Sequence, residues 1–141
     1  MLKLIRARRK HGEKGQALVE FALLVPIFLI LMFAIVDFGM GFYSWITVTN
    51  GAREGARLGA VLASADEITD RVYDSIVLAD EDTKMTVTVT NAQGAPGESV
   101  VVQVDYDYDF MTPLAGLIQF MTGDTIGPTL TLSSTADMRL E

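Results

Sequence analysis

The sequence predicts an α+β protein, in which a long N-terminal transmembrane helix continues into a small extracytoplasmic domain with one or two helices and a three-stranded antiparallel sheet. Three observations predict it. An apolar run without charged residues extends from Phe21 to Val36. Small residues recur at four-residue spacing between Ile46 and Leu62, and no proline interrupts them. Further on, apolar and polar residues alternate between turn-forming segments, as they do in strands.

The apolar run is hydrophobic enough to enter a membrane. Twelve of its sixteen residues are Leu, Ile, Val or Phe, and together they supply about −4 to −7 kcal/mol on the insertion scale. Glu20, just before the run, costs at most about 3 kcal/mol. Sixteen residues rise only about 24 Å, whereas the hydrocarbon core is roughly 30 Å thick. We therefore expect residues 17–19 and 38–48 to help to span it.

Charge predicts the orientation of this helix. Residues 1–14 contain six Lys or Arg and one Glu, a formal charge of +5, whereas the rest of the chain contains five basic and seventeen acidic residues, a charge of −12. Basic flanks stay in the cytoplasm. We expect a single-pass protein of the cytoplasmic membrane, with its N-terminus inside, its C-terminal domain outside, and Tyr43 and Trp45 at the outer interface. The acidic domain argues against nucleic acid or anionic lipid as its partner.

A secretory signal peptide also places a basic region before an apolar stretch. Its small-residue cleavage pattern is missing here, because Gly39 and Gly41 provide no A-x-A sequence and the apolar stretch continues past them. A cleaved secretory signal is disfavoured for that reason. An uncleaved signal anchor remains open.

A more specific pattern overlaps the start of the helix. Gly15 opens the segment GQALVEFALLVP, and Glu20 follows that glycine by five residues. The segment resembles the class III, prepilin-type signal of the TadE-like pseudopilins of the tight-adherence (Tad/Flp) pilus system. The resemblance continues in NGAREGARLGA at residues 50–60 and, less specifically, in TLTLSSTADMRLE at residues 129–141.

This resemblance implies that a prepilin peptidase cleaves between Gly15 and Gln16 at the cytoplasmic face, reading a signal that includes Glu20 and Phe21. The implied partners are the membrane, the prepilin peptidase, other pilin-like subunits and the pilus export platform. The chain would divide into a basic leader (residues 1–15), the transmembrane helix with its extension (residues 16–63) and the extracytoplasmic domain (residues 64–141).

Cleavage would make Glu20 the fifth residue of the mature chain and would create a positive amine at Gln16. A carboxylate in apolar surroundings is strongly favoured by a nearby positive charge. That charge could be the chain's own amine; resemblance to type IV-like pilins implies the amine of an adjacent subunit. Alternatively, Glu20 lies at the headgroup level and needs no partner.

Three glycines mark one face of the helix beyond the membrane: Gly51, Gly55 and Gly59. Each costs a free helix about 1 kcal/mol, so we expect compensation from another helix or the sheet, as small-residue faces permit. In assembly, we expect this face to contact a neighbouring subunit or the export platform. A flexible linker is the alternative.

Charged residues lie between these glycines. Glu54 and Arg57 form a favourable i,i+3 pair, and Arg53 is close by. A solvated helix face explains all three without a special role. The resemblance to TadE-like proteins makes Arg53, Glu54 and Arg57 candidates for subunit contacts.

The outer domain contains recognisable element signals. Ser64 and Asp66 are N-cap candidates for a second helix, which the acidic turn at residues 80–82 should end. Its predicted inward face consists of Ile68, Val72, Tyr73, Ile76 and Val77. The expected later elements are a strand (85–90), a hairpin-type loop (91–97), a longer strand (99–110), a short helix from Pro113 to Phe120 closed by Gly123, and a last strand (129–138) introduced by Gly127 and Pro128.

Candidate chemical sites are few. The sequence has no cysteine, and its one histidine, His11, lies in the predicted leader, so neither a thiolate site nor a His-based triad is expected in the mature chain. Asp105, Asp107 and Asp109 have the first spacings of a calcium loop, but the later positions do not fit. We expect these carboxylates to face solvent and the intervening aromatic residues to face inward; weak calcium binding stays open.

We therefore expect no enzyme, cofactor or metal site. The favoured interpretation is a membrane-anchored, minor pilin-like subunit that contributes to the assembly of Tad/Flp-type pili for surface adherence. The alternative is an uncleaved single-pass membrane protein with an extracytoplasmic binding domain.

Overall fold

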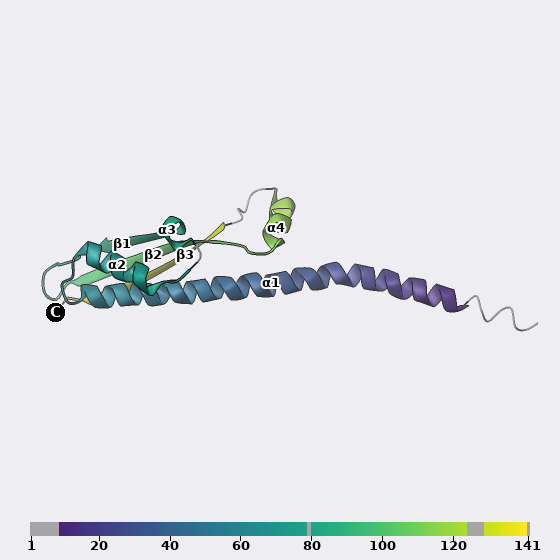
Figure 1. Cartoon of the computed structure of the whole chain (residues 1–141), viewed down its shortest axis with the longest axis horizontal. Coiled ribbons are helices and arrows are strands. Elements are labelled where there is room, and N and C mark those ends of the chain that lie inside the picture. The colour runs from purple at the N-terminus through teal and green to yellow at the C-terminus, as the bar shows by residue number, and fades with distance from the viewer. Residues whose placement is uncertain (1–8, 79, 124–128, 141) are drawn as a thin grey trace, which may run out of the picture.

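A long helix carries a small α+β domain on its C-terminal half (Figure 1). The structure, a computed structural model, describes residues 9–78, 80–123 and 129–140, with side chains from residue 15 onward. Most of the predicted leader, with Lys3, Arg6 and Arg8, lies outside the described residues. The first helix, α1, runs without a break from Arg9 to Gly59, so the chain stays helical where a flexible linker was the alternative.

The N-terminal half of α1 stands free of the domain. It is long and apolar enough to cross a membrane, and none of the residues from Gly15 to Val36 is buried. The twenty-one residues from Gln16 to Val36 rise about 32 Å, which matches the hydrocarbon core. The domain begins to pack on the helix at Asp37, and Ser44 and Val48 are buried against it. Residues 16–36 are therefore long enough to span without help, while residues 38–48 lie partly against the domain and keep Phe38 and Phe42 exposed.

The second helix, α2, extends from Ala65 to Ser75. Its N-cap is Ser64, as predicted, in a capping box with Glu67 that satisfies backbone N–H groups at the helix start. Ile68 and Val72 are fully buried, as expected. The prediction for Val77 is wrong, because the helix ends before it and leaves its side chain 78% exposed.

The acidic turn also differs from its prediction. Residues 80–82 do not end α2; instead Glu81–Lys84 form a four-residue helix, α3. Asp80 precedes it with φ 55°, in the left-handed region. The Leu78 N–H donates to the Glu81 carboxylate at 2.7 Å, so this acid helps to fold the turn between α2 and the first strand.

Three antiparallel strands form the sheet in the order β1-β2-β3: Met85–Thr90, Ser99–Asp109 and Thr129–Arg139. These limits differ from the predicted ones by at most one residue. The fourth helix, α4, spans Leu114–Thr122 between β2 and β3, after Pro113 and before Gly123, whose φ of 61° ends it. Gly127 and Pro128 lie outside the described residues.

The core lies where α1 and α2 cover one face of the sheet (Figure 1). Alternate residues of β2 point into it, from Val100 to Tyr108, while α1 contributes small residues, Ala52 and Ala56. The sheet therefore sits directly against the extension of the membrane helix, and the whole domain is attached along residues 37–59.

Candidate functional site

Gly15 lies inside α1, and a Cβ added there would have no neighbour within 4 Å. Glycine in a helix interior costs roughly 0.5–1 kcal/mol relative to alanine. Within the described structure, neither a close contact nor a positive φ requires glycine at this position. Gly39 and Gly116 have equally open surroundings.

Glu20 lies one helical turn after Gln16 on the exposed surface of α1. The Gln16 side-chain amide donates to its carboxylate at 3.0 Å, and the neighbouring Phe21 is 65% exposed. Among the described residues no cation pairs with Glu20. The residues of the predicted cleavage signal are thus all accessible from outside the chain.

The glycine face of α1 is filled by the chain itself. A Cβ on Gly51, Gly55 or Gly59 would come within 3.0 Å of a side-chain carbon on α2, on the residue that follows α2, or on β2. The respective neighbours are Ile76, Val72 and Val100. The expected close approach of a helix and the sheet is therefore found, but inside one chain; this face is closed to a neighbouring subunit or an export platform.

Glu54 joins α1 to α2. Its carboxylate accepts hydrogen bonds from Arg57 at 2.8 Å and from Arg71 of α2 at 2.5 Å. These bonds, that of Arg57 first, lower the pKa of Glu54 to about 2. The predicted pair of Glu54 and Arg57 is present, and Arg71 is a partner that helical spacing could not reveal. Arg53 is exposed and has no partner among the described residues.

Asp37 forms the second connection between α1 and the domain, and sequence reasoning missed its role. Its side chain is buried and accepts from the N–H groups of Met111 and Thr112, at 2.9 and 3.2 Å, and from the Thr112 hydroxyl. The Tyr108 hydroxyl donates to the Asp37 backbone carbonyl at 3.1 Å. The available signal was a lone acid inside an otherwise apolar helical stretch.

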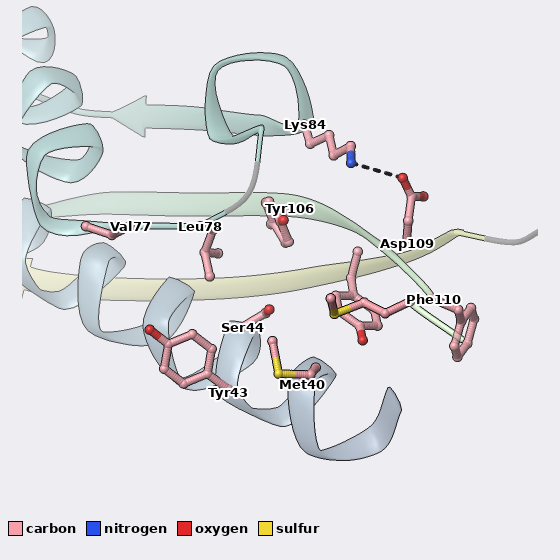
Figure 2. A pocket seen from close by; sticks show the side chains of 11 residues that line it. Met40, Tyr43, Ser44, Val77, Leu78, Lys84, Tyr106, Asp109 and Phe110 are labelled. Atoms are coloured by element: carbon pink, nitrogen blue, oxygen red, sulfur yellow. Dashed lines mark ion pairs between the residues drawn. The ribbon is translucent and has the colours of Figure 1, made fainter. Parts of the chain in front are cut away.

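A pocket of about 450 Å³ opens between α1 and β2 (Figure 2). Met40, Tyr43 and Ser44 line it from α1. Lys84 and Asp109 form an ion pair of 3.0 Å at its side; the pKa of Lys84 is raised by its bonds to Asp80 and Asp109. Apart from this pair, most of the lining is apolar or aromatic, which suits packing of an apolar group.

The aspartates of β2 face away from the core, as predicted. Asp105, Asp107 and Asp109 each accept a hydrogen bond from a hydroxyl of β3, while Tyr106 and Tyr108 are buried. The respective hydroxyl donors are Ser133, Thr131 and Thr129. Across the described ranges, no three His, Cys, Asp or Glu side chains are grouped to hold a metal ion.

Comparison with known proteins bears on the N-terminal part of the chain. A family model described as TadE-like protein matches residues 15–57. Neither the curated proteins nor the solved structures contain a match. The matched segment begins at Gly15 and covers the apolar span, Asp37, and the stretch with Glu54 and Arg57. The resemblance to the TadE-like family is thereby confirmed for residues 15–57.

Proposed function

We propose that this chain is a membrane-anchored, pseudopilin-type subunit that contributes to the assembly of Tad/Flp-type pili, with its domain on the outer side of the cytoplasmic membrane. The observation that carries the proposal is the start of α1: a glycine without a close neighbour, followed by an exposed acid and an apolar helix in which no residue up to Val36 is buried. An exposed apolar helix of this length can lie in the lipid bilayer before assembly and pack against the helices of other pilin-like subunits afterwards.

In this proposal, a prepilin peptidase removes residues 1–15. The scissile bond after Gly15 lies within α1, so the peptidase has to open the helix locally, and glycine lowers the cost of doing so. The new amine of Gln16 then lies four residues from Glu20. Two opposite charges in an apolar setting compensate each other when subunits dock in register.

The Glu20→Gln variant tests the docking step because it keeps the side-chain shape and removes the charge. We expect normal insertion and cleavage but a several-fold lower recovery in complexes purified with other pilin-like subunits. Asp137→Asn, an exposed acid on β3, is the matched control and should assemble normally. Full recovery of Glu20→Gln with intact processing would contradict the proposed role of this carboxylate.

A further inference from the structure

α4 presents large apolar side chains to its surroundings. Its sequence, LAGLIQFMT, has no charged residue, and Leu114 is its one buried residue. Phe120 is 87% exposed and Met121 is 77% exposed; Met111, just before the helix, is 68% exposed. Short helices depend on packing of an apolar face for most of their stability. The domain therefore covers α4 only in part and leaves Phe120 and Met121 uncovered.

Hydrogen bonds fix the position of α4 along the membrane helix. Asp37 accepts from Met111 and Thr112, and the Leu114 N–H donates to the Thr112 hydroxyl oxygen at 3.2 Å. This chain of bonds connects the first residue of α4 to residue 37 of α1. Because residues 16–36 match the hydrocarbon thickness, α4 begins at the outer edge of the membrane-spanning segment.

The direction of α4 also fits this location. Figure 1 shows it beyond the end of the sheet, on the side of the free half of α1, and turned across the direction of α1. A helix that crosses the direction of a spanning helix lies in the plane of the membrane surface. With nine residues, α4 is about 14 Å long and too short to span.

We propose that α4 is an interfacial helix that inserts into the outer surface of the same bilayer that α1 spans, with Phe120 and Met121 among the lipid chains. Continuity identifies lipid as the occupant: the exposed apolar residues of α1 next to Asp37 are already in the bilayer at that level. The absence of charge from α4 means that zwitterionic lipid suffices. The domain would then contact the membrane at two points, which restricts its tilt.

Depth-dependent fluorescence quenching tests this with the full chain in phosphatidylcholine vesicles. Trp45 is the single tryptophan. The Trp45→Phe variant therefore has no tryptophan fluorescence, and one reporter tryptophan at a time can be introduced into it. Phe120→Trp reports on α4. Phe28→Trp reports on the centre of the span, and Val61→Trp, an exposed site beyond the other end of α1, serves as the control outside the bilayer.

We expect lipids brominated near the headgroup to quench Phe120→Trp several-fold more than Val61→Trp, and lipids brominated deep in the chains to quench Phe28→Trp most. Met121→Trp repeats the measurement at a second exposed position. The proposal is overturned if both α4 reporters are quenched no more than Val61→Trp while Phe28→Trp is quenched. In that case α1 lies in the bilayer and α4 does not. Quenching of α4 reporters that disappears when protein is diluted in lipid would also overturn it, in favour of contact between copies.

Discussion

At the scale of single residues, two carboxylates connect the membrane helix to the domain in different ways. Burial of a carboxylate is costly unless hydrogen bonds compensate, and Asp37, at 1% exposure, accepts three. Glu54 stays partly exposed and relies on two arginines. Asp37 therefore fixes the membrane-proximal end of the domain by burial, and Glu54 fixes α2 by charge.

Replacement of Asp37 by alanine should loosen the end of β2 and the start of α4. It leaves the partly buried N–H groups of Met111 and Thr112 without their acceptor, at a cost of up to about 1–3 kcal/mol, the figure for a fully buried donor. We expect faster amide exchange at these two residues and a lower urea midpoint for the domain in micelles. Asp107→Ala, at an exposed aspartate, is the control. Unchanged exchange at Met111 and Thr112 would show that the Asp37 bonds contribute nothing.

The Glu54 cluster predicts an acid-sensitive contact between α1 and α2. The pKa of the Glu54 carboxyl is lowered from 4.5 to about 2 in the folded chain. The ionised carboxylate therefore stabilises the fold at pH values above its pKa in the unfolded chain. That contribution is lost as the pH falls from about 4.5 through about 2. The denaturation midpoint of the wild type should fall over this window more than that of Glu54→Gln. Parallel pH profiles of the two proteins would contradict the prediction.

At the scale of elements, the fit between α1 and the domain depends on small residues. Gly55 lies against Val72 of α2 and Val102 of β2, so a side chain there displaces both elements. Gly55→Leu should destabilise the domain by about 1–3 kcal/mol through overpacking, while membrane insertion persists. The same substitution at Gly39, where a Cβ meets nothing within 4 Å, should be tolerated. Equal unfolding midpoints for the two variants would rule out the packed glycine face.

Sequence patterns predicted where the helices and strands lie along the chain better than which of them pack together. Alternation placed β1 and β2 to within a residue, because a two-residue period is local. The glycine stripe predicted close packing but not that α2 would fill it, since spacing says nothing about which surface approaches. Asp37 was missed for the same reason: its partners, Met111 and Thr112, are more than seventy residues away along the chain. Val77 was misplaced because α2 ends at Ser75, two residues before the apolar helical pattern does.

At the scale of the whole molecule, one helix serves two environments. In its first half, from Gly15 to Val36, no residue is buried. Its second half, from Asp37, packs against the sheet and α2 and contributes buried residues to the core. The change begins at Asp37 and is gradual: Phe38 and Phe42 are still exposed, whereas Ser44 and Val48 are buried. Such a chain presents a free apolar helix and a fixed outer domain, the two parts that a membrane-anchored pilin-like subunit needs.

The central claim is that the start of α1 contains a processing signal: residues 1–15 are removed after Gly15, and the apolar helix stays in the mature chain. Intact-mass and N-terminal measurement of the chain extracted from its native membrane tests it most directly, beside Gly15→Leu and the matched control Gly39→Leu, both at glycines with open space around them. We predict that the wild type and Gly39→Leu begin at Gln16, and that Gly15→Leu retains Met1. A wild-type chain that begins at Met1, or a Gly15→Leu chain trimmed to Gln16 at the normal rate, would contradict the account.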